Sequence, residues 1–224
     1  MNHPIRNLIF GLGLMVIIFG PIQAGAPKGA PTDKDPNAYQ GLSSQDLERL
    51  RKGEIVVIKD ISAEENTSKG MIQAAIIFNQ PIDTVWSLMC QGWRQEEYLP
   101  NVDRTILAKK LPDGDIIENR LTIFFVDINF WVRGYHYPDR YYVNWTLAPG
   151  YKNDMKRLEG FWQYYYVDDQ HTLARYGTIT ETGFGVPTRV QEYLTKRDLP
   201  TSLGRVKKWV DSGGTFRKPG YQPQ

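Results

Sequence analysis

The feature that most constrains this fold is a series of strand-like segments separated by short turn signals. The turns at Pro112-Asp113-Gly114 and at Pro138-Asp139 leave only a few residues between neighbouring segments. Connections this short join antiparallel neighbours, because a parallel crossover needs about a dozen residues or more. We therefore expect an antiparallel meander rather than a series of βαβ units. The expected strands are 54–61, 70–79, 102–111, 115–128, 129–137, 140–147, 156–167 and 171–181.

Helical patterns lie ahead of this meander, near its beginning and at its end. Residues 43–52 indicate a short capped helix. After strand 70–79, Pro81 stops the ladder pairing, and apolar residues at 82–89 then form one helical stripe. A second short helix is expected at 93–98. The last stripes are formed by Val190, Tyr193 and Leu194, and then by Leu199, Leu203, Val206 and Val210.

This order of elements predicts a sheet with one long helix across one face. A single sheet has two faces, at least one of which must be covered, and the closing helix is the only element long enough to do so. A strongly curved sheet around one helix leaves interior room that side chains fill only in part. The two short helices would then close one end of the groove with their aromatic faces.

The segment QPIDTVWSLMCQGWRQEEYLPNVDRTILAKKL resembles the first half of the START-like, polyketide-cyclase and birch-pollen-allergen superfamily (SRPBCC). The later RDLPTSLGRVKKWV is similar to the closing helix of that superfamily, and the resemblance covers residues 53–212. It implies an α+β helix-grip fold, in which a curved antiparallel sheet wraps around a long C-terminal helix and two short helices follow the first core strand. It also implies a deep apolar cavity, most often for a lipid, sterol, quinone or polyketide.

The two ends of the chain predict export and flexible flanks. Residues 1–26 contain Arg6, an apolar run shorter than the roughly 20 residues of a membrane span, and small residues at a cleavage spacing, as in a signal peptide. An uncleaved anchor is the alternative. We expect a disordered linker at 27–42, a START-like ligand-binding domain at 43–212 and a flexible tail at 213–224. The protein would then be periplasmic or secreted after cleavage.

The few cysteines and histidines and the small net charge limit the kinds of site that this chain can form. Cys90 is the only cysteine, so no internal disulfide can form, and His136 and His171 are the only histidines after the apolar run. We therefore expect no metal and no other cofactor. The formal net charge of +2 implies no large basic face for nucleic acid. We expect a monomer whose partner is a hydrophobic small molecule, and a transient contact with a membrane is left open.

The density of tryptophan and tyrosine in the strands has two interpretations. Aromatic residues favour strands and can simply pack a core. They can also line a pocket, where their polar tips contact a ligand. His136 shares a strand face with Phe130 and Val132, so it is either a ligand anchor or a structural histidine. The candidate ligand-binding residues are Trp86, Tyr98, Phe125, His136, Trp145, Trp162, Tyr164, Arg175, Phe184, Val190, Tyr193, Leu194, Leu203 and Val206.

Three functions are compatible with this pattern. The first is an exported protein that binds or transports a hydrophobic small molecule, such as a lipid, a sterol or hopanoid, a quinone or a polyketide-like compound. The second is a cyclase, dehydratase or hydrolase that uses the same cavity, although no spacing in the sequence indicates a catalytic pair. The third is an assembly or interaction module with a filled core. A carboxylate that converges on a histidine inside a cavity would favour the second.

Overall fold

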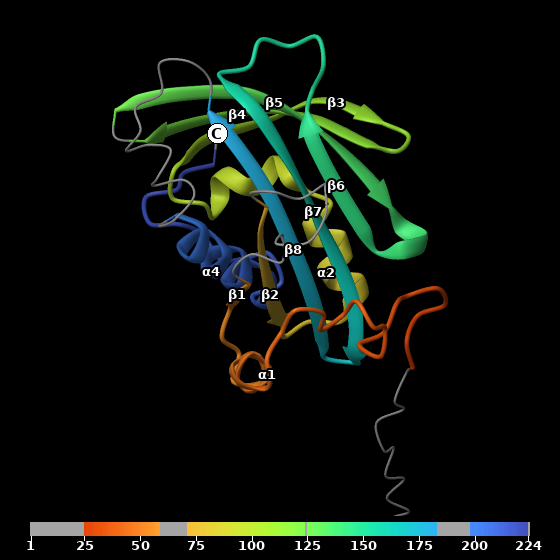
Figure 1. Ribbon diagram of the computed structural model, residues 1–224. Coiled ribbons are helices and arrows are strands. Elements are labelled where there is room, and N and C mark those ends of the chain that lie inside the picture. The colour runs from red at the N-terminus through yellow and green to blue at the C-terminus, as the bar shows by residue number, and fades with distance from the viewer. Residues whose placement is uncertain (1–24, 59–70, 124, 183–197, 224) are drawn as a thin grey trace, which may run out of the picture.

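The computed structural model describes residues 25–58, 71–123, 125–182 and 198–223 (Figure 1). Within these ranges no helix is both long and apolar enough to cross a bilayer. The helices are α1 (Ser44–Arg51), α2 (Ile82–Met89), η1 (Gly92–Glu97), η2 (Pro138–Arg140) and α4 (Asp198–Asp211). The strands are β1 (Val56–Ile58), β2 (Ile72–Phe78), β3 (Val102–Leu111), β4 (Gly114–Ile123), β5 (Val126–Tyr137), β6 (Tyr142–Leu147), β7 (Met155–Asp168) and β8 (His171–Thr182).

The described strands form one antiparallel sheet of eight strands in the order β1-β2-β8-β7-β6-β5-β4-β3. Strands β3 to β8 follow one another as the expected meander, and β2 joins it by pairing with β8. Helices α2 and η1 occupy the connection between β2 and β3, and the sheet curves around the side on which they and α4 lie (Figure 1). The predicted α+β helix-grip fold is confirmed.

One expected strand is in fact two. The segment 115–128 contains a hairpin turn, because β4 ends at Ile123 and β5 begins at Val126. Phe125 has a φ of 67° in this turn, a left-handed conformation that a strand residue does not adopt. The placement of Phe125 within a continuous strand 115–128 is therefore wrong.

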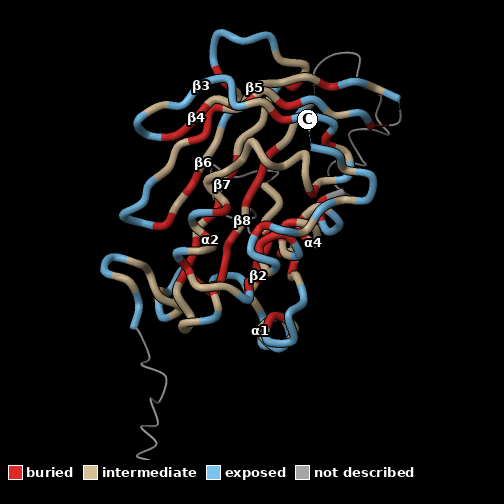
Figure 2. Tube along the Cα trace, turned by 180° about the vertical axis from the view of Figure 1, so that it is seen from behind, coloured by how far each residue is buried: buried red, intermediate tan, exposed pale blue. Residues whose placement is uncertain are grey.

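The sheet carries a hydrophobic cluster on each of its two faces, and buried residues are frequent along β2 and β8 (red in Figure 2). Strand β2 shows the alternation clearly: Ala74 and Ile76 pack toward α4 and α2, whereas Ala75 belongs to a separate cluster on the outer face. Because side chains alternate along a strand, both faces of this edge of the sheet need a cover. The outer cluster consists of Ala38, Leu50, Val56, Ile58, Ala75, Tyr165 and Leu173.

Residues 27–42, for which composition predicted a disordered linker, supply part of this outer cover. Thr32 forms a bridge with Tyr166 on β7, and Ala38 is fully buried. On β8, the guanidinium of Arg175 donates to the backbone carbonyls of Ala38 and Gln40 at 3.1 and 2.8 Å. The apolar outer face of the sheet and the buried Arg175 guanidinium therefore hold the segment 27–42 in place, although its proline and glycine content alone would predict disorder.

The residues after α4 also pack on the domain, in contrast to the expected flexible tail. The backbone N–H of Lys218 donates to the carbonyl of Glu97 at 2.8 Å, and Arg217 lies 3.2 Å from the Glu97 carboxylate. Arg94 donates to the carbonyl of Gly214 at 2.9 Å. The end of the chain therefore connects η1 to the C-terminus of α4.

Candidate ligand-binding cavity

A cavity of about 290 Å³ lies between the inner face of the sheet and the helices α2, η1 and α4. Its size is at the lower limit of small-molecule pockets, which range from about 300 to 1,000 Å³. The interior is therefore not packed solid, as an assembly module with a filled core would require. The lining consists of Met89, Gly92, Gln95, Tyr98, Leu99, Asn101, Val102, Asp115, Ile117, Asn119, Leu121, Ile123, Ile128, Phe130, Val132, Gly134, His136, Val143, Trp145, Met155, Leu158, Trp162, Tyr176, Thr178, Thr180, Leu199, Ser202, Leu203 and Val206.

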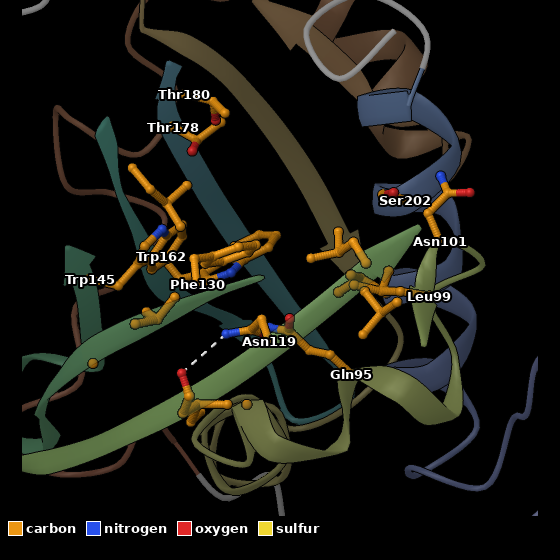
Figure 3. Close-up of a pocket in the computed structure, with 18 of the residues that line it drawn as sticks. Gln95, Leu99, Asn101, Asn119, Phe130, Trp145, Trp162, Thr178, Thr180 and Ser202 are labelled. Carbon is orange, nitrogen blue, oxygen red and sulfur yellow. Dashed lines mark hydrogen bonds between the residues drawn. The ribbon is translucent and has the colours of Figure 1, made fainter. Parts of the chain in front are cut away.

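Aromatic rings form the wall of the cavity on β6, β7 and β8. The ring centroids of Trp162 and Tyr176 are 4.6 Å apart, and those of Trp145 and Tyr176 are 5.9 Å apart. Gly160 makes this wall possible, because a Cβ there would lie 2.2 Å from the Trp145 ring. The missing side chain of Gly160 therefore leaves room for one of the protein's own rings. Figure 3 shows Trp145, Trp162 and Phe130 gathered on one side of the cavity.

Polar side chains are spread over the remaining lining. Asn119 on β4 donates to the carbonyl of Ile117 at 3.2 Å (dashed in Figure 3), and Thr178 on β8 donates to the carbonyl of Glu159 at 3.1 Å. These contacts fix the orientation of both side chains and leave part of their hydrogen-bonding capacity facing the cavity. The cavity is thus mainly apolar and aromatic, with a few fixed polar groups.

The end of the cavity beneath α2 and η1 contains a carboxyl and an imidazole. Oδ2 of Asp115 lies 3.6 Å from Nε2 of His136, and the Asp115 residue is only 3% exposed. Burial raises the pKa of Asp115 to about 6, although Arg133 and Lys110 oppose the shift. Burial lowers the pKa of His136, and the nearby Arg133 lowers it further. Both shifts favour the uncharged forms, so the two groups do not form a stable ion pair.

The raised pKa of Asp115 predicts a specific pH dependence of stability. The folded protein holds this proton at pH values where the unfolded chain has lost it, so stability falls as the pH rises from about 4 through about 6. The uncharged Asp115→Asn variant lacks this loss. Relative to wild type it should therefore gain on the order of 3 kcal/mol between about pH 4 and about pH 7. Urea unfolding of both proteins across this range measures the gain, and a difference that is independent of pH would contradict it.

Six of the candidate residues from the sequence lie in the cavity lining. Tyr98 comes from the end of η1, and Leu203 and Val206 come from α4. His136 lies on the inward row of β5, as its shared face with Phe130 and Val132 indicated. The complete set is Tyr98, His136, Trp145, Trp162, Leu203 and Val206.

Two further candidates pack behind the lining instead of forming part of it. Trp86 on α2 contacts the rings of His136 and Tyr141 with centroid distances of 6.4 and 5.7 Å. It therefore holds α2 against the sheet and supports the His136 ring from behind. Tyr164 is fully buried in the core, next to Trp86.

Two candidates lie away from the cavity. Phe125 is fully exposed at the β4–β5 turn. Arg175 points to the outer face of the sheet, because it alternates along β8 with Ala174 and Tyr176, which face inward. Four candidates fall outside the described residues: Phe184, Val190, Tyr193 and Leu194.

Asp115 and Asn119 also line the cavity but are not among the candidate residues from the sequence. Ile117, Leu121 and Ile123 share one side of the expected strand, and a strict period of two places Asp115 and Asn119 in the same row. Both were overlooked because only the apolar members of this row were considered, although Asp115 and Asn119 already lay within the expected strand 115–128. Applying the alternation to every residue of the strand would have found both polar groups.

Cys90 does not supply a nucleophile here. It lies at the C-terminal end of α2, half buried. Burial raises the pKa of its thiol to about 12, with a smaller contribution from Asp115. The thiolate is the reactive form, so Cys90 remains an inert thiol near neutral pH, as a structural cysteine would.

The comparisons with known proteins agree with this architecture. No family model and no curated protein matches the chain. Among solved structures, it is similar to a STAR-related lipid transfer protein from Xanthomonas axonopodis, with 11% identity, a TM-score of 0.53 and coverage of 70% of this chain and 98% of that one. For the Zhui aromatase/cyclase from Streptomyces sp. R1128, the identity is 10% and the TM-score is 0.52, with coverage of 64% of this chain and 92% of that one. For a START superfamily protein from Mycobacterium smegmatis, the identity is 14% and the TM-score is 0.50, with coverage of 63% of this chain and 94% of that one.

These similarities establish the fold. The chain has the START-like, helix-grip architecture, and the described residues place a cavity between its sheet and its helices. The predicted resemblance to the START-like and polyketide-cyclase superfamily is confirmed at the level of the fold.

Proposed function

We propose that this protein is an exported binding or transport protein for a hydrophobic small molecule. The observation that carries the proposal is the interior cavity, whose lining is predominantly apolar and aromatic. Side chains of this kind bind a ligand by removing its apolar surface from water. The apolar run near the N-terminus supports export, and one of the similar structures is a STAR-related lipid transfer protein.

The cavity supports a moderate affinity. Burying about 400 Å² of apolar ligand surface at about 25 cal/mol per Å² contributes about 10 kcal/mol. Loss of translational and rotational freedom removes at least about 4 kcal/mol of this. A net value of about 6 kcal/mol corresponds to a Kd of tens of micromolar, roughly. Tighter binding therefore requires a polar contact, and the polar groups of the lining can provide one.

The test is to identify what the purified protein contains and then to fill the cavity. Native mass spectrometry and organic extraction should recover an apolar molecule in a 1:1 complex. Ser202 lines the cavity from α4, so Ser202→Trp should occupy the space and reduce binding at least tenfold. The neighbouring Thr201 is exposed on the same helix, so Thr201→Trp is the matched control and should bind normally.

Two results would contradict the proposal. One is protein that contains no ligand and binds none from a panel of sterols, quinones, fatty alcohols and fatty acids. The other is equal binding by the Ser202→Trp and Thr201→Trp variants, because the ligand would then lie elsewhere.

The Asp115–His136 pair favours a second candidate function, which is acid–base catalysis in the same cavity. A carboxyl and an imidazole 3.6 Å apart can transfer a proton to and from a bound substrate. The extraction experiment distinguishes the two functions. A ligand that wild type converts to a new product, and that His136→Ala leaves unchanged, would identify an enzyme rather than a carrier.

A further inference from the structure

The polar end of the cavity is a built feature of the sheet. Asp115 pairs with Gly134 across β4 and β5, and a Cβ on Gly134 would lie 2.8 Å from Oδ1 of Asp115. The missing side chain therefore leaves the space that the carboxyl occupies. On the other side, Trp86 packs edge-on against the His136 ring. Both polar side chains are thus held at one place in an otherwise apolar lining.

The charges around this end do not neutralise the Asp115 carboxyl by direct contact. The guanidinium of Arg133 is the closest charged group on β5, but it donates to the carboxylate of Asp113 at 2.5 Å and to the carbonyls of Asp115 and Gly134. The other titratable neighbours are Cys90 on α2, whose thiol stays protonated, and Lys110 on β3, which acts at longer range. Near neutral pH the cavity therefore contains an acidic group beside an uncharged imidazole.

Asp115 and His136 together can offer one ligand hydroxyl group both a hydrogen-bond acceptor and a hydrogen-bond donor. An oxygen atom can lie within about 2.8 Å of both Oδ2 of Asp115 and Nε2 of His136, because these two atoms are only 3.6 Å apart. The hydroxyl donates its proton to the carboxylate and accepts a hydrogen bond from the N–H of the imidazole. A ligand carboxylate would instead bring a second negative charge next to Asp115 in a buried site, which is strongly unfavourable.

We propose that the ligand is a compact, uncharged hydrophobic molecule with one alcohol or phenol group, and that this group binds between Asp115 and His136. The inference rests on the proposed ligand-binding function and specifies its ligand class. The cavity volume of about 290 Å³ fits one such molecule and is too small for a phospholipid with two acyl chains. A free fatty acid is the excluded alternative, since its apolar part is equally suitable but its head group is charged.

A matched pair of probes tests this preference. 1-Dodecanol and dodecanoate share one chain and differ in the head group, and their binding can be followed by the fluorescence of Trp145 and Trp162, which line the cavity. At pH 7.5 wild type should bind the alcohol at least tenfold more tightly than the acid. In Asp115→Asn the ratio should fall below about threefold, mainly because the acid binds more tightly. Asp127→Asn, an exposed carboxylate on β5 that contacts Thr122, should behave as wild type.

The outcomes separate this inference from the proposed function. If both probes bind with equal affinity to wild type, and Asp115→Asn changes neither, the hydroxyl assignment is wrong while the ligand-binding function stands. If the acid binds more tightly than the alcohol, the assignment is also wrong. If neither probe binds to folded wild type, both the assignment and the ligand-binding function are contradicted.

Discussion

Replacing Trp209 by alanine should cost about 3–5 kcal/mol of stability and lower Tm by about 10 °C. Trp209 is fully buried on α4 and stacks on Tyr98 with a centroid distance of 4.5 Å. The Arg94 guanidinium lies 5.2 Å from the Trp209 ring centroid. The indole therefore joins α4, η1 and the C-terminal residues in one packed unit. Its loss leaves a cavity where the helix that covers the sheet is anchored, and thermal and urea unfolding measure the effect.

Two variants control for the identity of the side chain. The indole N–H of Trp209 is buried and has no hydrogen-bond partner among the described residues. Trp209→Phe should therefore keep most of the stability, with a loss of about 1 kcal/mol or less. Trp131 is only partly buried and stacks on Tyr151 outside the core, so Trp131→Ala should cost about 1 kcal/mol. Equal losses for Trp209→Ala and Trp131→Ala would show that α4 is not anchored through Trp209.

Most of the fold could be predicted from local patterns. The turn residues between the strands specify antiparallel pairing, and Pro81 marks the end of β2 and the start of α2. The apolar stripe of α2 was correct, since Ile82 and Val85 are buried. The closing helix was also correct, although its largest core residue, Trp209, was not assigned to the stripe. It falls three residues after Val206, a helical spacing that places it near the same face.

Features that depend on long-range contacts could not be predicted in this way. Residues 27–42 look disordered by composition, and they are ordered because the outer face of β2, β7 and β8 needs a cover. The outward position of Arg175 also depends on long-range contacts, because the backbone carbonyls to which it donates lie more than 100 residues away in the sequence.

The candidate site was predictable where strand alternation alone decides which residues face inward. Trp145, Trp162 and His136 follow from the period of two, and all of them line the cavity. The alternation failed at Phe125, where the β4–β5 hairpin turn reverses the chain. The pairing of Asp115 with His136 was out of reach, because it depends on the register of β4 against β5, which places Asp115 opposite Gly134.

The second large effect should come from Arg175→Met, with an expected loss of about 3 kcal/mol. The Arg175 residue is only 5% exposed, and its guanidinium donates to the carbonyls of Asn37, Ala38 and Gln40 and to the Gln73 side chain. Methionine retains the apolar stem but leaves these buried acceptors without their donor. The segment 27–42 should then detach more often, and chymotrypsin should cleave after Tyr39 faster than in wild type.

Two substitutions separate the buried guanidinium from a general effect of removing an arginine. Arg157 on β7 pairs with Glu159 at 2.9 Å on the surface, so Arg157→Met should change stability by less than about 0.5 kcal/mol and leave cleavage after Tyr39 unchanged. Arg175→Lys keeps the charge but loses the several fixed N–H donors of the guanidinium. Its stability and its rate of cleavage after Tyr39 should therefore lie between those of wild type and Arg175→Met. If Arg175→Met resists cleavage as wild type does, the segment is held by the apolar contacts of Ala38 and its neighbours, and the guanidinium merely fills space.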